Sequence, residues 1–135
     1  MSPIHSISGL PAFLAYYAVA LALIGCYLAV YVTATAHREI TLIRAGNVSA
    51  AVALGASLIG YAVPLAMAIY NAQSILDLIV WGLVALVVQI GIYWLMRPVF
   101  PDLSRRIEAD ETAPALLLGA ASLAGGIVNA ACMTY

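Results

Sequence analysis

The chain has 135 residues, of which 65% are hydrophobic and 8% are charged, and its formal net charge is −1. A soluble domain is usually about 45–50% apolar and about 25% charged, and a chain this short cannot bury so much apolar surface. With a mean hydropathy of +1.06, the composition predicts a protein that is solvated by lipid. It excludes soluble enzymes, disulfide scaffolds and disordered chains. Five basic residues are also too few for nucleic-acid binding.

Four stretches without charged residues are long enough to cross a bilayer, which takes roughly 20 apolar residues. In chain order they cover residues 10–32, 48–70, 78–96 and 113–135. A helix satisfies its own backbone hydrogen bonds in lipid, and short connections place consecutive helices side by side. The sequence therefore predicts an all-α membrane protein: one antiparallel bundle of four spanning helices that forms a single domain over residues 1–135.

The arginines predict the orientation of this bundle. Arg38 and Arg44 lie in the first connection, and Arg97, Arg105 and Arg106 lie in the third, whereas the second connection and both ends of the chain carry no basic residue. Arginine and lysine accumulate in cytoplasmic connections. We therefore expect the first and third connections in the cytoplasm and both termini outside.

The same two connections form the candidate surface for a partner. Asn47 is also expected to cap the second span. One interpretation is a solvated rim of nearly balanced charge, and the other is a docking surface for a cytoplasmic protein. The residues singled out for this surface are Arg38, Glu39, Arg44, Asn47, Arg105 and Arg106.

The chain reads as two similar halves. Residues 43–47 can be aligned with residues 107–111, 64 positions later, and the same offset pairs residues 54–56 with residues 118–120. Each half would be a helical hairpin inserted in the same direction, with the two halves related by an axis along the membrane normal.

Two motifs carry a family resemblance. The run Glu-Ile-Thr-Leu-Ile-Arg-Ala-Gly-Asn at residues 39–47 and the ending Gly-Gly-Ile-Val-Asn-Ala-Ala-Cys-Met-Thr-Tyr at residues 125–135 resemble the domain-of-unknown-function 350 family, also called YjfL-like proteins. The resemblance implies a small bacterial inner-membrane protein with four spans. Members are often encoded near phage-shock-protein-A-like envelope-stress proteins. The molecular activity of the family is unassigned, so the resemblance implies no mechanism.

The spans carry no charged side chain, which disfavours a proton-coupled carrier. The two histidines, His5 and His37, are predicted on opposite sides of the bilayer and so cannot share a metal ion. No catalytic nucleophile and base occur at a recognisable spacing. We therefore expect no catalytic residue, no metal site and no cofactor.

Three residues stand out inside the spans: Gln89, Asn129 and Pro64. An amide that faces lipid is costly, so Gln89 and Asn129 should face another helix or a wet cavity. Pro64 lacks an N–H and frees the carbonyl of Gly60, and the repeat places Pro64 and Asn129 at equivalent positions. Asn129 is therefore expected to donate to this freed backbone. The amides are interpreted as packing contacts, with a conduction or substrate site as the alternative.

Small residues follow the second and fourth spans at helical spacing. Such residues let helix backbones approach closely in lipid, so we expect these two spans to meet at the bundle centre. The same surfaces could instead bind a second copy of the chain. The residues assigned to packing are Ala56, Gly60, Ala121, Gly125 and Gly126.

The leading interpretation is a non-enzymatic inner-membrane protein that acts as a scaffold or docking component in envelope maintenance. The alternative is a small channel or passive transporter formed by an oligomer. The expected partners are the lipid bilayer, a cytoplasmic or membrane protein, and further copies of the chain.

Overall fold

The computed structural model describes residues 7–35 and 38–133 and consists of helices. Four of them are long and apolar enough to cross a membrane: α2 (Leu10–Ala34), α4 (Val48–Asn71), α5 (Ile75–Met96) and α7 (Thr112–Ala131). No strand occurs in the described ranges. Much of the outer surface is apolar, with Leu95 and Val87 about three-quarters and two-thirds exposed. The chain is thus an all-α four-helix membrane bundle, as predicted.

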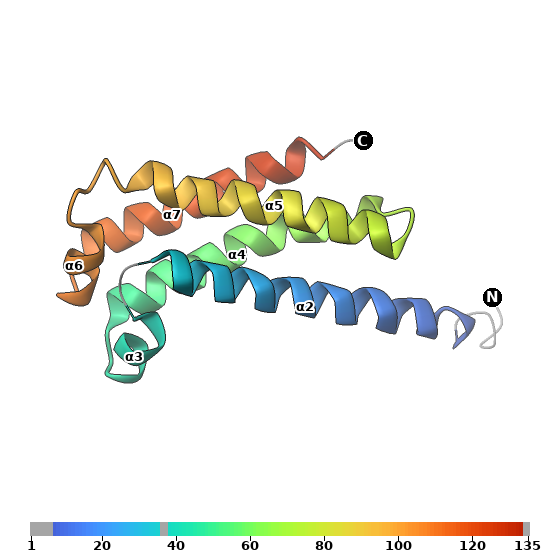
Figure 1. Cartoon of the computed structure of the whole chain (residues 1–135), viewed down its shortest axis with the longest axis horizontal. Coiled ribbons are helices and arrows are strands. Elements are labelled where there is room, and N and C mark those ends of the chain that lie inside the picture. The colour runs from blue at the N-terminus through green and yellow to red at the C-terminus, as the bar shows by residue number, and fades with distance from the viewer. Residues whose placement is uncertain (1–6, 36–37, 134–135) are drawn as a thin grey trace.

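Two short helices lie at the same end of the bundle. Helix α3 (Glu39–Arg44) precedes α4, and helix α6 (Leu103–Glu108) precedes α7. Figure 1 shows both at one end, whereas the start of α2 and the end of α7 lie at the other. All five arginines lie in the two connections that contain these short helices, between α2 and α4 and between α5 and α7. We therefore call this end the arginine end.

The backbone repeats with the predicted offset of 64 residues. Helices α3 and α6 begin and end at equivalent positions, and so do the starts of α4 and α7. The turn between each short helix and its long helix has the same conformation. Gly46 (φ 91°) and Asp110 (φ 60°), at equivalent positions, both lie in the left-handed region. The two halves therefore fold as matched helical hairpins.

Helices α4 and α7 run parallel to each other and form the most extensive contact in the bundle. Parallel packing is the result expected when two hairpins of equal orientation meet through their second helices. Helix α5 packs on all three other long helices, and α2 packs on α4 and α5. The core therefore lies along α4 and α5, and α2 is the helix most exposed to lipid.

Two helix limits differ from the sequence expectation by more than two residues. Helix α5 begins at Ile75 rather than 78, because the Ser74 hydroxyl accepts a hydrogen bond from the backbone N–H of Asp77 at 3.2 Å and caps the helix. Helix α7 ends at Ala131 rather than 135.

Candidate functional site

The backbones of α4 and α7 touch at the bundle centre. A Cβ built on Gly60 would lie 2.5 Å from the carbonyl oxygen of Ser122. A Cβ built on Gly126 would overlap the carbonyl oxygen of Gly60 and lie 2.8 Å from its carbonyl carbon. Each helix thus places a glycine against a carbonyl of the other, and no larger residue fits at this crossing.

This crossing explains how the carbonyl freed by Pro64 is covered. Pro64 is buried inside the continuous helix α4, and Gly126 packs directly on the Gly60 carbonyl. The Nδ2 of Asn129 is buried but has no hydrogen-bond partner among the described residues. The predicted hydrogen bond from Asn129 to this backbone is therefore wrong, because a glycine backbone occupies the position instead.

The remaining small residues lie around the crossing. Ala56 of α4 faces Gly119 of α7, where an added Cβ would lie 2.8 Å from the Ala56 side chain. Gly125 faces the Ile92 side chain of α5 rather than α4. Ala121 is half-buried. The α4–α7 contact therefore also includes Gly119, which the sequence placed in the repeat but not among the packing residues.

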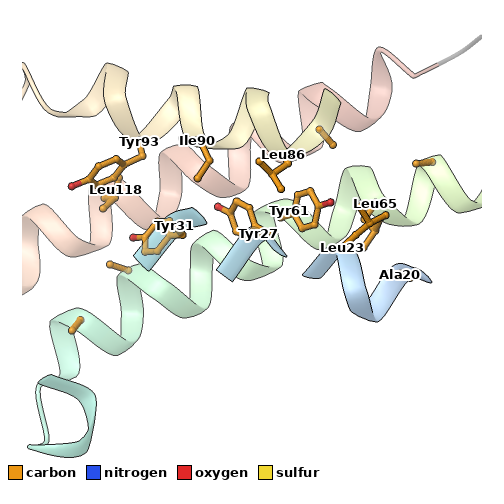
Figure 2. Close-up of a cluster of buried hydrophobic side chains, with 14 of the residues drawn as sticks. Ala20, Leu23, Tyr27, Tyr31, Tyr61, Leu65, Leu86, Ile90, Tyr93 and Leu118 are labelled. Carbon is orange, nitrogen blue, oxygen red and sulfur yellow. The ribbon is translucent and has the colours of Figure 1, made fainter. Parts of the chain in front are cut away.

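Four tyrosines are buried inside the bundle, and we call them the tyrosine cluster. Tyr27 and Tyr31 come from α2, Tyr61 from α4 and Tyr93 from α5, and none is more than 1% exposed. The rings of Tyr27 and Tyr61 stack with centroids 4.5 Å apart, and Tyr93 meets Tyr31 edge-on at 5.8 Å. Figure 2 shows the four rings in a row along the bundle. Aromatic packing thus joins α2 to both central helices.

Hydroxyl and amide groups lie beside these rings. The Gln89 Nε2 donates to the carbonyl oxygen of Ser122 at 3.0 Å, and the hydroxyls of Ser57 and Ser122 are 3.2 Å apart. The Tyr61 hydroxyl donates to the carbonyl oxygen of Gly82 at 2.9 Å. Gln89, Ser57 and Ser122 are at most 2% exposed. The structure therefore brings Gln89 to the α4–α7 crossing, whereas the Nδ2 of Asn129 bonds to none of these groups.

Apolar side chains fill the bundle beyond Tyr61, toward the end opposite the arginines. Leu23, Leu65 and Leu78 are buried there, and Figure 2 shows Leu23 and Leu65 directly next to Tyr61. The polar interior thus occupies the half of the bundle nearer the arginine end.

Glu39 is part of this interior. It is fully buried, and the Thr35 hydroxyl at the end of α2 donates to its Oε1. The prediction that Glu39 belongs to a solvated rim is therefore wrong. The first residue of α3 therefore lies inside the arginine end of the bundle rather than on its surface.

The two connections at the arginine end are bonded to each other. The Asn47 Oδ1 accepts from the N–H of Ala50 at 2.8 Å, which confirms the expected cap. The Nδ2 of Asn47 donates to the carbonyls of Ile107 and Glu108 at 2.9 and 3.2 Å. Asn47 thus caps the start of α4 and the end of α6 at once.

Asp110 makes the reciprocal contact. Its Oδ1 accepts a hydrogen bond from the backbone N–H of Ser49 at 2.9 Å, so the second hairpin supplies a carboxylate to the first turn of α4. This N–H lowers the pKa of the Asp110 carboxyl below its usual value. The two hairpins are therefore joined in both directions.

Acidic solution should weaken this junction. The pKa of Asp110 is lower in the folded state than in the unfolded chain. Its ionised carboxylate therefore stabilises the fold above about pH 4, the ordinary pKa of aspartate. This stabilisation is lost as the pH falls through the folded-state pKa. We expect the thermal midpoint of the wild type in detergent to fall more steeply below pH 4 than that of Asp110→Asn. Asparagine tolerates the left-handed conformation and still accepts a hydrogen bond. Equal pH profiles for the two proteins would contradict this role.

The arginines of the connections differ in their pairing. Arg105 pairs with Asp102 at 2.8 Å, and Arg106 pairs with Glu111 at 3.1 Å. Arg38, Arg44 and Arg97 are exposed and have no carboxylate partner within residues 7–35 and 38–133. Glu108 and Asp110 are likewise exposed and pair with no arginine in these ranges, so the unpaired charges at this end are three arginines and two carboxylates.

No group of three histidine, cysteine or carboxylate side chains gathers in the part of the chain that the structure describes. The two histidines considered in the sequence, His5 and His37, lie outside the described residues.

Sequence reasoning missed the tyrosine cluster as a unit. Its signal was the spacing of Tyr27 and Tyr31, four residues apart in a span, and the equal spacing of Gln89 and Tyr93. Residues four apart lie on one helix face, so each pair pointed to a shared polar interior.

Comparisons with known proteins agree with this architecture. The Domain of Unknown Function family DUF350 matches residues 5–133. The chain is 41% identical to the UPF0719 inner membrane protein YjfL of Escherichia coli K12 over 97% of its own length and 99% of that protein. It is 30% identical to the UPF0719 transmembrane protein YshE of Bacillus subtilis over 73% of its length and 75% of that protein. No solved structure matches. The chain therefore belongs to the DUF350 family of multi-pass membrane proteins.

Proposed function

We propose that this protein is a non-enzymatic docking component of the inner membrane, used in envelope maintenance, whose arginine end faces the cytoplasm. All five arginines of the chain support this orientation, because basic residues are retained on the cytoplasmic side. Both termini then lie outside. The partner would be a soluble protein with acidic side chains that can pair with Arg38 and Arg44, which are exposed and have no carboxylate partner in the described ranges.

The observation that carries the proposal is the mutual capping of the two connections. Asn47 bonds to the carbonyls of Ile107 and Glu108, and Asp110 bonds to Ser49. Connections held in one geometry lose little conformational entropy when a partner binds.

Helix α3 presents the docking surface. Arg38 is exposed and unpaired, and the neighbouring Ile40 is 48% exposed. An exposed apolar side chain beside an unpaired guanidinium is the usual composition of a protein contact. The α3 surface, defined by Arg38 and Ile40, is therefore the site to probe.

Photocrosslinking tests this assignment. A photoreactive residue at position 40 should crosslink to a soluble cytoplasmic protein in living cells, and Arg38→Gln should reduce the yield. The matched control is position 87, where the side chain is 68% exposed on the spanning helix α5 and should crosslink only to lipid or membrane proteins. The captured protein, once purified, should bind the reconstituted membrane protein in a salt-dependent manner.

A small oligomeric channel is the second candidate, and the buried polar interior favours it. Gln89, Ser57, Ser122 and the tyrosine cluster place hydroxyls and an amide at membrane depth. The apolar packing beyond Tyr61 requires a conduction path to include further copies of the chain. We would abandon the docking proposal for a channel if liposomes containing the protein showed potassium or proton flux, if Gln89→Leu abolished this flux, and if the protein had an oligomeric mass. Absence of flux together with crosslinking at position 40 supports docking.

A further inference from the structure

An apolar groove runs between α2 and α5 in the half of the bundle nearer the arginine end. It encloses about 390 Å³. Its lining residues are Ala29, Val30, Thr33, Ala34, Ile90 and Trp94. The hydroxyl of Thr33 donates to the carbonyl oxygen of Ala29 at 2.7 Å, so the only hydroxyl donor among the lining residues is already bonded within α2. The groove therefore suits a hydrocarbon chain.

The face of α5 that lines this groove continues to an arginine. Ile90, Trp94 and Arg97 are spaced by four and then three residues, which places them on one side of a helix. Arg97 directly follows the last residue of α5, Met96. It lies where the spanning helix ends, at the level of the lipid headgroups. Trp94, 57% exposed one turn deeper, occupies the depth that tryptophan prefers at a membrane interface.

Arg97 also lines a second cavity, which is smaller and more polar. This cavity encloses about 180 Å³ and includes Ser104 and Arg105. Asp102, which also lines it, already pairs with Arg105 at 2.8 Å. Arg97 has no carboxylate partner among residues 7–35 and 38–133. The free cationic group of this cavity is therefore the guanidinium of Arg97.

We propose that this face of α5 binds one anionic phospholipid, with the phosphate at Arg97 and an acyl chain in the α2–α5 groove. A guanidinium forms paired hydrogen bonds to phosphate oxygens, and an unpaired one beside a negatively charged leaflet favours anionic lipids. The acyl chain of the same lipid can lie in the apolar groove, which begins one helical turn deeper in the membrane. A single amphiphile can contact both the Arg97 guanidinium and the apolar α2–α5 groove, whereas a free anion can contact only the guanidinium.

Native mass spectrometry of the purified full chain tests the proposal. After exchange into micelles doped with either phosphatidylglycerol or phosphatidylcholine, we expect one phosphatidylglycerol to be retained per chain and phosphatidylcholine to be lost. Arg97→Gln should lower phosphatidylglycerol binding about fivefold, the value for one cationic residue at an anionic surface. Arg97→Lys, which keeps the charge but not the paired hydrogen bonds, should lower it less than Arg97→Gln does. Because Arg97 is exposed, these variants should fold normally.

Two further variants distinguish the alternatives. Arg44→Gln removes an equally exposed, unpaired arginine at the same end and should leave lipid retention unchanged. Ala29→Trp, which fills the groove, should weaken retention although no charge changes. Glycerol 1-phosphate at millimolar concentration should not displace the lipid, because it lacks the acyl chain.

Several results would overturn the assignment. Equal losses in Arg97→Gln and Arg44→Gln would show diffuse charge attraction instead of a site. Equal retention of the two lipids would remove the role of the arginine. Displacement by glycerol 1-phosphate would indicate an anion site, and a dimeric mass that Ala29→Trp abolishes would show that a second copy covers the groove.

Discussion

Replacing Gly126 by alanine should destabilise the bundle more than any other single-methyl change in the described helices. The added Cβ would overlap the carbonyl oxygen of Gly60. That atom belongs to the backbone of a helix fixed by Pro64 and the tyrosine cluster, so it cannot rotate away as a side chain could. The helices must separate, and we expect a loss of about 3 kcal/mol, measured as a lower midpoint for unfolding in mixed micelles of mild detergent and dodecyl sulfate.

Gly55→Ala is the matched control for this variant. Gly55 lies in α4, and a Cβ built on it meets nothing within 4 Å. Alanine also has the higher helix propensity, so this change should be neutral or slightly stabilising. The stability of Gly125→Ala should lie between those of Gly126→Ala and Gly55→Ala, because the added Cβ meets the flexible end of the Ile92 side chain. An unchanged midpoint in Gly126→Ala would mean that α4 and α7 do not cross at these glycines.

Loss of the Asn47 side chain should have the second largest effect. Asn47→Ala removes the cap on the N–H of Ala50 and the hydrogen bonds to the carbonyls of Ile107 and Glu108. A lost cap costs about 1 kcal/mol, and the lost bonds between the hairpins add about the same amount. We expect a total of about 2 kcal/mol, measured by the same unfolding titration.

Asn47→Ser separates the two contributions. A serine hydroxyl still accepts from the N–H of Ala50, but this shorter side chain has no amide to donate to the two carbonyls of α6. The serine variant should therefore lose about half as much stability as the alanine variant, and hydrogen exchange should increase in the last turn of α6 more than in the first turn of α4. If the serine variant is as stable as the wild type, the contact between the hairpins contributes nothing, whereas equal losses in the two variants would mean that the cap contributes nothing.

Most of the fold could be predicted from the sequence because lipid imposes strict rules on it. A bilayer requires long uncharged helices, and the four spans were found within a few residues of the observed helices. The offset of 64 residues, found from residues 43–47 and 107–111 alone, recurs in the bounds of α3 and α6 and in the turns at Gly46 and Asp110. These features depend on local sequence, which is why they could be read in advance.

The site was harder to predict because it depends on how helices rotate and tilt. Glycines at positions 125 and 126 look alike in sequence, yet one faces α5 and the other faces the backbone of α4. Asn129 was assigned to a carbonyl that Gly126 covers. Glu39 was placed in a rim because it is charged, although the Thr35 hydroxyl four residues earlier allows it to be buried. Each outcome was decided by contacts between distant residues rather than by spacing along one helix.

The joined hairpins also bear on how the protein is assembled. The ties between them at the arginine end, at the central crossing and at Asn71, whose Nδ2 donates to the carbonyl of Met133 at 2.7 Å, connect residues about 60 positions apart. The first hairpin leaves the ribosome before the whole of α7 has been synthesised. Its glycine surface must stay exposed to lipid until α7 inserts. Maturation therefore waits for the last helix, and a truncated product would present this surface to the quality-control proteases of the membrane.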